Sequence, residues 1–350
     1  MVSGQRRVVV IGGGIAGVSI AGELSHDHDV VLLEAEETLA HHTTGRSAAV
    51  LLPGYGNKVV RELTQRSIAL YAERSEKYEV ELLEPRAFLQ IAGADRADAL
   101  RDIVSKTPTM HMIDIEDAFT MCPYLQRDAV VAAAIDETGS AIDVASLHQT
   151  YVREIAANGG VIVKNKRVDA IALGNPCVVS AGDETWECDL VVNAAGAWGD
   201  VVAAMANCKP VGLMPLRRTI FTTKVDPALG RGPLVFGTPE AYYFGLDHGV
   251  LLGSPADETL SEPCDARPEE IDVAQAIESV NEVTTFNIRS IDTAWAGLRT
   301  FAPDRSPVVG CIQMGPGLAE YGAFLVRGLV PEEHGAAQVD VDRVSPNRFP

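Results

Sequence analysis

The sequence contains no block of lysine or arginine, and its 29 basic residues stand against 48 acidic ones, for a formal net charge of −19. Because nucleic-acid binding requires a basic surface, we expect no nucleic-acid partner. The six cysteines include no C-x-x-C pair, so the sequence indicates neither a metal cluster nor a redox dithiol. Scattered cysteines fit a reducing compartment, and we expect a cytoplasmic protein.

Long apolar runs are also missing. No run of about 18 apolar residues could cross a bilayer, so we expect no transmembrane segment. The first apolar strand begins near the N-terminus, and we expect no signal peptide before it. Low-complexity segments and internal repeats are lacking too. With 350 residues, 47% of them hydrophobic, the chain is long enough for one large domain or two interleaved ones.

The most informative stretch is residues 7–34. Residues 8–11 form an apolar run that predicts a buried parallel strand, and Gly12, Gly14 and Gly17 follow it at the G-x-G-x-x-G spacing. A helix predicted over residues 15–25 would direct its N-terminal N–H groups at phosphate oxygens.

A second predicted strand, residues 30–33, ends in Glu34, whose carboxylate can accept the hydroxyls of a ribose. The order of strand, glycines, helix, strand and acid therefore indicates a dinucleotide site. The alternative is a glycine-rich turn in some other α/β protein.

The rest of the chain predicts an α/β fold, α+β overall. Helical patterns cover residues 57–78, 97–106, 115–121, 143–157 and 268–283, and strand patterns cover 87–91, 130–135, 161–164, 168–173, 189–195, 211–254 and 293–298. We expect a discontinuous Rossmann-like FAD-binding domain (residues 1–80, 145–210 and 290–350) and an inserted antiparallel-sheet substrate domain (residues 81–144 and 211–289).

Residues 42–49, 191–198 and 295–310, taken with the glycine motif, carry a resemblance to a known family. The chain resembles the D-amino acid oxidase-like FAD-dependent oxidoreductases, which include glycine oxidase and sarcosine oxidase. It is most similar to bacterial D-arginine dehydrogenase-type enzymes, over nearly the whole chain to about Gly310. The resemblance implies FAD rather than NAD.

The resemblance also implies cofactor-binding residues. These are Gly12, Gly14, Ile15, Ala16, Gly17, Glu34, Ala35, Thr44, Gly45, Arg46, Ser47, Val168, Ala195, Gly196 and Trp198. The cysteine that links flavin covalently in monomeric sarcosine oxidases would fall near Gly297, so we expect non-covalent FAD. His42 occupies the place of a flavin-linking histidine in some relatives, which leaves a covalent bond as the alternative.

For the substrate, Arg299 matches the family's carboxylate-binding arginine and Arg218 a second active-site arginine. Tyr243 matches a tyrosine that contacts the substrate carboxylate, and Tyr55 matches a lid tyrosine. Their competitors are structural: Arg299 could pair with an acid such as Asp304. Arg217 and Tyr242 would replace Arg218 and Tyr243 if the strand register slipped by one.

Two departures from the family pattern bear on function. Phe88, after Pro85 and Arg86, stands where relatives that prefer cationic substrates carry a glutamate, so the inferred substrate side chain is apolar or aromatic. The alternative is a cation–π contact between Phe88 and a cationic side chain. After Gly310 the family continues into a glycine-rich turn facing the flavin, which this sequence lacks unless Gly315 and Gly317 form it. We expect weakened FAD binding if the turn is missing.

The resemblance implies an enzyme that oxidises the Cα–N bond of a D-amino acid to an imino acid, which hydrolyses to a 2-oxo acid and ammonia. Its electron acceptor would be oxygen or a quinone. The alternatives are a glycine- or sarcosine-type secondary-amine oxidase, an inactive homologue and, least favoured, an NAD-dependent enzyme.

Overall fold

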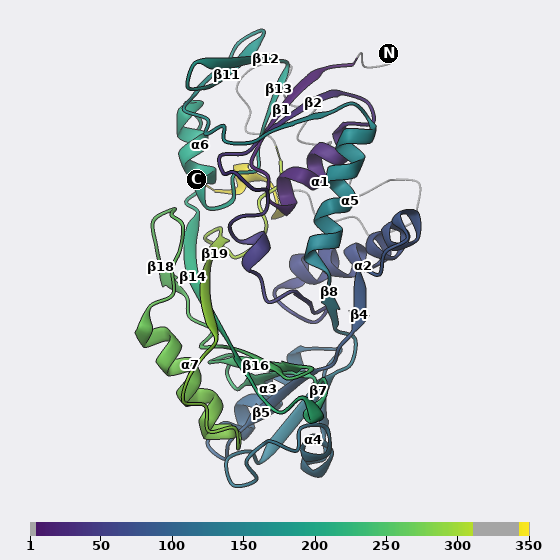
Figure 1. Ribbon diagram of the computed structural model, residues 1–350, viewed down its shortest axis with the longest axis vertical. Coiled ribbons are helices and arrows are strands. Elements are labelled where there is room, and N and C mark those ends of the chain that lie inside the picture. The colour runs from purple at the N-terminus through teal and green to yellow at the C-terminus, as the bar shows by residue number, and fades with distance from the viewer. Residues whose placement is uncertain (1–4, 311–342, 350) are drawn as a thin grey trace.

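The computed structural model describes residues 5–310 and 343–349. Two regions lie end to end in it: a parallel-sheet region that contains the N-terminus and a large-sheet region at the opposite end (Figure 1). The turn expected after Gly310, including the alternative through Gly315 and Gly317, lies outside the described residues.

The parallel-sheet region is built on four strands in the order β13-β1-β2-β9, with every neighbouring pair parallel. The strands are β1 (Arg7–Ile11), β2 (Asp29–Leu33), β9 (Val161–Val163) and β13 (Leu190–Asn193). Val8 and Val10 pack toward α1 (Ile15–Leu24) and α5 (Val144–Ala157), whereas Val9 and Ile11 pack toward a smaller sheet. Both faces are covered, which explains the continuous apolar runs in the sequence.

The smaller sheet has the order β10-β11-β12 and covers the second face together with α6. Its strands are β10 (Ala170–Ala172), β11 (Cys177–Ala181) and β12 (Glu184–Cys188), and α6 spans Gly199–Met205. Asp200, in the first turn of α6, accepts hydrogen bonds from the N–H groups of Val211 and Leu213 at 2.8 and 2.7 Å. These bonds fix the chain where it leaves for the large sheet.

The large sheet has nine strands, in the order β18-β14-β17-β16-β15-β5-β7-β6, with β19 also paired to β14. The strands are β5 (Phe88–Ala92), β6 (His111–Ile113), β7 (Ala132–Asp136), β14 (Met214–Lys224), β15 (Leu234–Gly237), β16 (Tyr243–Asp247), β17 (Val250–Ser254), β18 (Thr259–Leu260) and β19 (Thr293–Phe301). Helices α4 (Ile115–Met121) and α7 (Glu270–Val283) cover one face, and α3 (Ala97–Lys106) packs at the far end of the sheet. The opposite face, along β14 and β19, turns toward the parallel-sheet region (Figure 1).

Helix α2 (Lys58–Tyr78) and a small sheet, β3-β8-β4, lie between the two regions. That sheet is formed by β3 (Val50–Leu51), β4 (Leu83–Pro85) and β8 (Ser140–Ile142). Arg74 of α2 hydrogen-bonds Thr150 and Glu154 of α5, and Lys77 Nζ lies 2.7 Å from Glu154 Oε1. Burial alone would raise the pKa of Glu154, but the hydrogen bonds from Lys77 and Arg74 lower it to about 2. A buried ion-pair network therefore joins α2 to the parallel-sheet region.

The fold class expected from the sequence is confirmed, as are the long helices. Asn57 Oδ1 caps α2 and Asp143 Oδ1 caps α5, each accepting from a first-turn N–H. The short strands β3, β4, β6 and β8 were not predicted. The division into domains stays a proposal: β19, which it assigns to the FAD-binding segments, pairs along its whole length with β14.

None of the helices within residues 5–310 and 343–349 combines the length and apolarity that crossing a membrane requires.

Candidate functional site

The glycine turn between β1 and α1 is closely packed. Gly12 has φ +110°, and a Cβ there would lie 2.5 Å from the carbonyl oxygen of Ala194. A Cβ on Gly17 would lie 1.8 Å from the carbonyl oxygen of Gly12, which excludes any other residue without a backbone shift. Gly14 is the N-cap of α1, and the helix has no acidic residue in its first turn. The N–H groups of Ile15 and Ala16 thus lie at a positive helix end that no acidic side chain of the first turn neutralises.

Glu34, at the end of β2, is bound to this turn. Its Oε2 accepts from the N–H of Gly13 at 2.6 Å, and its Oε1 accepts from the N–H of Glu36 at 2.8 Å, beyond Ala35. A carboxylate offers about four lone-pair sites, so two acceptor positions remain for ribose hydroxyls. His148, on α5, lies with Nε2 2.9 Å from the carbonyl oxygen of Gly13. No motif in the sequence points to this buried histidine.

Thr44 contacts the helix end directly. Its Oγ1 accepts from the N–H of Ile15 at 3.0 Å, the position that a phosphate oxygen takes at a dinucleotide-binding helix. Gly45, next in the 3₁₀ turn Thr44–Arg46, donates its N–H to the carbonyl oxygen of Ala40 at 3.0 Å. Ser47 Oγ accepts from the N–H of Ala49 at 3.3 Å. Residues 40–47, called the flavin-side loop below because they include four of the expected cofactor residues, therefore lie beside the glycine turn.

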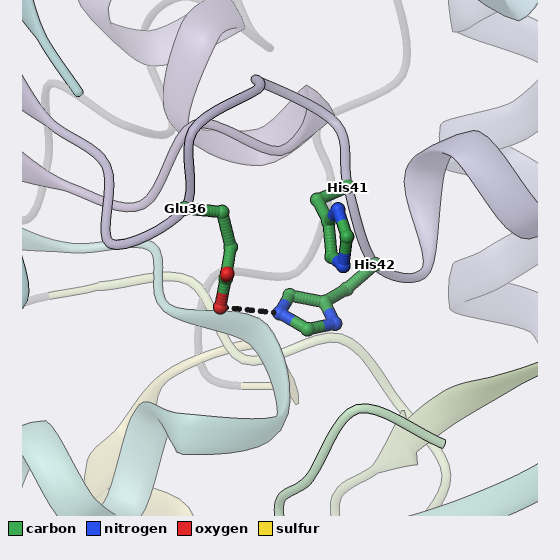
Figure 2. Close-up of side chains that lie close together, drawn as sticks. All are labelled: Glu36, His41 and His42. Carbon is green, nitrogen blue, oxygen red and sulfur yellow. Dashed lines mark hydrogen bonds and ion pairs between the residues drawn. The ribbon is translucent and has the colours of Figure 1, made fainter. Parts of the chain in front are cut away.

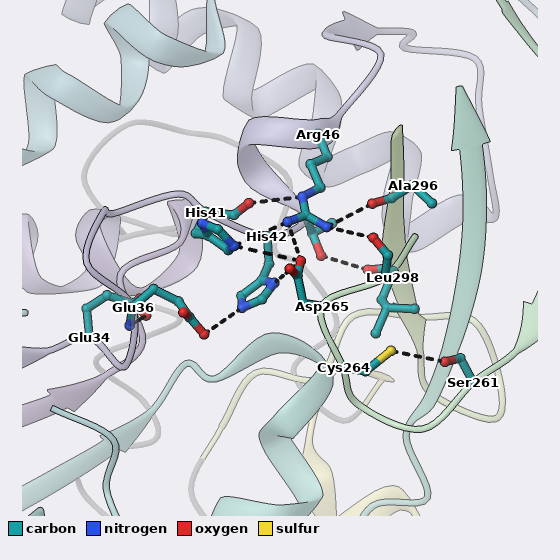
Figure 3. A network of polar contacts seen from close by, with 12 residues as sticks. Glu34, Glu36, His41, His42, Arg46, Ser261, Cys264, Asp265, Ala296 and Leu298 are labelled. Atoms are coloured by element: carbon teal, nitrogen blue, oxygen red, sulfur yellow. Dashed lines mark hydrogen bonds and ion pairs between the residues drawn. The ribbon is translucent and has the colours of Figure 1, made fainter. Parts of the chain in front are cut away.

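Arg46 ties this loop to the large sheet. Figure 3 shows its guanidinium reaching the carbonyl oxygens of His41 and Ala296 and the carboxylate of Asp265. Trp295 Nε1 donates in return to the carbonyl oxygen of Arg46 at 3.1 Å. The guanidinium was expected to face phosphate or flavin, but protein acceptors engage it, so any direct contact with the cofactor falls to its backbone.

Glu36, His41 and His42 form a compact polar group (Figure 2). Their potential ligand atoms lie within 4.8 Å of one another, and His42 Nε2 is 3.1 Å from Glu36 Oε1. Imidazole and carboxylate are zinc ligands, but Glu36 already pairs with Arg167 at 3.0 Å. A charge-balanced network accounts for the group without an ion. The side chain of His42, the possible flavin-linking residue, is 23% exposed.

A second turn, residues 194–198, adjoins the glycine turn. Ala195 precedes the 3₁₀ turn Gly196–Trp198, in which Gly196 has φ +53°. The ring of Trp198 lies 4.7 Å from that of His42, so this turn contacts the flavin-side loop. Val168 is buried just before β10, near the end of β2, because Lys166 donates its N–H to the carbonyl oxygen of Glu34 at 2.8 Å.

The cofactor residues predicted from the sequence thus lie around one helix end, with Val168 at the end of β2. The turn offers helix N–H groups, close backbone approach and a carboxylate with spare acceptor positions, which fits a dinucleotide. This is the donor and acceptor set that a pyrophosphate and a ribose require.

The large sheet brings the four substrate candidates on its strands to one face. Paired residues of neighbouring strands share a face, and residues two apart along a strand do too. Phe88 pairs with Leu234, and Phe236, two residues along the same strand, pairs with Tyr243. Tyr243 in turn pairs with Ser254, and Leu252, two residues away, pairs with Thr222. Arg218 lies four residues from Thr222 on β14 and pairs with Gly297, two residues from Arg299. Phe88, Tyr243, Arg218 and Arg299 therefore share the face turned toward the parallel-sheet region.

The same register places the two sequence alternatives on the opposite face. Arg217 Nη2 lies 3.0 Å from Asp272 of α7, and Arg217 also pairs with Glu269. Tyr242 stacks on Phe244 in the core beneath α7, where burial raises its pKa to about 12.

Arg299 lies beside Tyr55, which comes from the loop after β3. Arg299 Nη2 is 3.4 Å from the hydroxyl of Tyr55, and its guanidinium lies 4.9 Å from the ring of Phe301. Asp304, named as a structural partner for Arg299, instead accepts two hydrogen bonds from Arg348, at 2.8 and 3.0 Å. The acid near Arg299 is Glu258, with its Oε1 3.9 Å from Arg299 Nη1. The Arg299 side chain keeps 31% exposure, so a ligand can reach it.

Two glutamates and an arginine that the sequence analysis did not single out complete this face. Glu258, between β17 and β18, pairs with Arg305 and approaches Arg218 and Arg299. Glu240 belongs to an exposed loop, but burial of its carboxylate raises its pKa, while Arg299 and Arg218 oppose that change. No motif marks these residues in the sequence, because they lie in separate segments between or after the strands and meet only in the folded chain.

Phe88 is 1% exposed and belongs to an apolar cluster that includes Leu234 and Tyr243. Its ring stacks on that of Phe236 with centroids 5.7 Å apart. Ala48, Val50 and Leu52, which follow the flavin-side loop, pack against the same cluster. The sheet face that carries the four substrate candidates, called the substrate face below, is thus charged around Arg299 and apolar around Phe88.

Comparisons with known proteins identify the family and the fold. The family model described as DAO, FAD dependent oxidoreductase, matches residues 7–337. Hydrogen cyanide synthase subunit HcnC of Pseudomonas aeruginosa is 29% identical over 43% of this chain and 34% of its own length. Glycerol 3-phosphate dehydrogenase of Caloramator mitchellensis is 23% identical over 83% of this chain and 64% of its own length. The match therefore spans less than two thirds of either relative.

Solved structures of other proteins show the same fold. Glycine oxidase from Geobacillus kaustophilus has a TM-score of 0.80 at 18% identity, over 98% of this chain and 99% of that one. L-proline dehydrogenase from P. horikoshii has a TM-score of 0.78 at 20% identity, over 99% and 98% of the two chains. At these identities the likeness shows the fold alone.

Proposed function

The chain belongs to the DAO family of FAD dependent oxidoreductases, and we propose that it oxidises the Cα–N bond of a D-amino acid with an apolar side chain. The observation that carries the proposal is the shared face of Arg299, Arg218 and Tyr243, with the Tyr55 hydroxyl 3.4 Å from Arg299. Two guanidinium groups, with the phenol hydroxyl of Tyr55 beside that of Arg299, are a donor set suited to a carboxylate.

When bound, FAD supplies the hydride acceptor for this chemistry. The substrate loses a hydride from Cα and a proton from nitrogen, so a C=N bond forms, and water then converts the imino acid to a 2-oxo acid and ammonia. Arg299 and Arg218 would fix the carboxylate, and Tyr55 would orient Arg299 through its hydroxyl. Orientation is the main contribution of the protein to such a reaction. Oxygen or a quinone would take up the electrons.

The D configuration rests on the resemblance to D-arginine dehydrogenase-type enzymes, and the apolar side chain rests on Phe88. A buried phenyl ring packed against Phe236 and Leu234 offers no counter-charge to a cationic side chain. Phe88→Glu should shift preference toward D-arginine and D-lysine. A wild-type protein that already prefers D-arginine over D-leucine would contradict this assignment.

Anaerobic flavin bleaching tests the proposal as a whole. The panel contains D- and L-amino acids and N-methyl amines. It also contains glycerol 3-phosphate and L-2-hydroxyglutarate, because relatives of this chain are named as dehydrogenases of these two compounds. We expect apolar D-amino acids to bleach the flavin fastest. Faster bleaching by sarcosine would favour the secondary-amine oxidase, and no bleaching by any donor would favour an inactive homologue.

Arg299→Lys tests the carboxylate assignment. Loss of a bidentate charged contact costs about 2–4 kcal/mol, so kcat/KM should fall roughly thirty- to a thousandfold while FAD stays bound. An unchanged kcat/KM would make Arg299 a structural residue.

A further inference from the structure

Glu258 lies among three arginines on the substrate face. Its Oε1 is 3.1 Å from Arg305 Nη1, and its Oε2 accepts a second bond from Arg305. The same Oε1 is 3.4 Å from Arg218 Nη2 and 3.9 Å from Arg299 Nη1. One carboxylate thus faces guanidinium groups from β14, from β19 and from the segment that follows β19.

The three contacts differ in quality. Arg305 uses two N–H groups in a fork on Glu258, the geometry of strong arginine–carboxylate pairs. Arg218 and Arg299 contribute single, long contacts. An incoming carboxylate can therefore take Arg218 and Arg299 while Glu258 stays on Arg305.

Glu258 is an anion that a ligand would meet. The hydrogen bond from Arg305 is the largest cause that holds the pKa of Glu258 below its ordinary value, so the side chain is charged at neutral pH. The side chains of Glu258 and Arg299 are each 31% exposed. The ring of Phe301 lies 4.6 Å from the Arg305 guanidinium and 4.9 Å from that of Arg299, so it contacts both arginines.

We infer that Glu258 determines specificity by occupying Arg305, so that the site admits substrates with one carboxylate and rejects those with two. The inference rests on the proposed function, in which Arg299 and Arg218 bind the substrate α-carboxylate. A second carboxylate would meet the negative charge of Glu258 and find Arg305 already paired. Repulsion of this kind is a common source of discrimination between similar ligands.

Ligand binding tests the inference without turnover. The ligands are propionate, which has one carboxylate, and succinate, which has two, titrated by calorimetry into the FAD-loaded protein. We expect wild type to prefer propionate, and Glu258→Gln to shift the ratio of dissociation constants toward succinate on the order of tenfold. The double variant Glu258→Gln with Arg305→Gln should lose that gain. Glu262→Gln, which removes an exposed charge four residues further along the chain, should behave as wild type.

A second experiment removes the partner of Glu258 and keeps Glu258 itself. Arg305→Gln leaves Glu258 without its main partner, so Glu258 should close on Arg218 and Arg299 and weaken propionate binding. Glu258→Asp should keep the wild-type preference if the charge is what matters.

The outcomes separate the two proposals. If wild type binds propionate but the ratio is unchanged in Glu258→Gln, the role of Glu258 is overturned and the proposed function stands. If wild type binds neither ligand and Arg299→Lys changes nothing, the carboxylate site itself is wrong and both proposals fall.

Discussion

The cofactor end and the substrate end of this molecule are built from different groups. At the glycine turn the donors are backbone N–H groups, and Thr44 supplies a neutral hydroxyl to the helix end. On the substrate face the donors are guanidinium groups, and Glu258 supplies a charged acceptor. In both places a side chain of the protein fills a position suited to a ligand oxygen, but the first occupant is neutral and the second is charged. The cofactor end therefore depends on backbone packing, and the substrate end on charge balance.

The largest expected effect comes from breaking the backbone packing. Gly17→Ala would place a methyl group 1.8 Å from the carbonyl oxygen of Gly12, so the turn must move. Overpacking against backbone costs roughly 3 kcal/mol or more, and FAD affinity should fall on the order of a hundredfold. Titration of apoprotein with FAD measures it.

The matched control for this change is Gly93→Ala. The added methyl group there would lie 3.3 Å from its nearest neighbours, outside the glycine turn. FAD affinity should stay at the wild-type value. Equal losses in both variants would mean that Gly17 acts through general stability alone.

The next largest effect concerns the buried ion pair between Arg74 of α2 and Glu154 of α5, which joins α2 to the parallel-sheet region. Glu154→Gln leaves Arg74 buried with a weakened partner and should cost about 3 kcal/mol of unfolding free energy at pH 7. The pKa of Glu154 is lowered to about 2 from an ordinary value of 4.5. The wild-type stabilisation is therefore complete above pH 4.5 and is lost as pH falls toward 2.

Urea denaturation across this pH range separates the two proteins. The variant should lose the pH dependence that Glu154 contributes, whereas Glu187→Gln, in an exposed pair with Arg7, should change little. Equal acid sensitivity in wild type and Glu154→Gln would exclude this network as its source.

A smaller effect separates neighbouring arginines on opposite faces of β14. Arg218→Lys should lower kcat/KM roughly ten- to a hundredfold, because it weakens a charged contact to the substrate. Arg217→Lys should leave kcat/KM near wild type and instead lower the melting temperature, since Arg217 pairs with Glu269 and Asp272. The reverse pattern would mean that Arg217, and not Arg218, faces the substrate.

The same two ends explain what the sequence could and could not predict. Gly12, Gly17 and Glu34 are readable because a single βαβ unit fixes their spacing, and the structure brings them together. Arg218 and Arg299 are separated by strands and loops, so their shared face follows only from the pairing of β14 with β19. Family resemblance supplied them in the absence of any local pattern.

Glu258 and His148 show the limit of sequence reasoning here. Glu258 is one of many acids in the chain, and only the loop between β17 and β18 carries it to three arginines. His148 lies on the buried face of α5, and its contact with Gly13 depends on how α5 packs. Neither contact leaves a mark in the linear order of residues.

The smallest effect tests whether Thr44 only stands in for a cofactor oxygen. Thr44→Val keeps the shape but removes the acceptor for the N–H of Ile15. Loss of a capping acceptor costs about 1 kcal/mol, so the apoprotein should lose that much unfolding free energy. Phosphate oxygens can replace the hydroxyl when FAD is bound, so the holoprotein should lose less.

Thr43→Val is the control for Thr44→Val. The Thr43 hydroxyl donates to the carbonyl oxygen of Leu298 at 2.7 Å, and its loss should weaken both forms alike. Chemical denaturation with and without saturating FAD measures all four values. If Thr44→Val weakens both forms equally, its hydroxyl is a permanent part of the site, and the parallel between Thr44 and Glu258 fails.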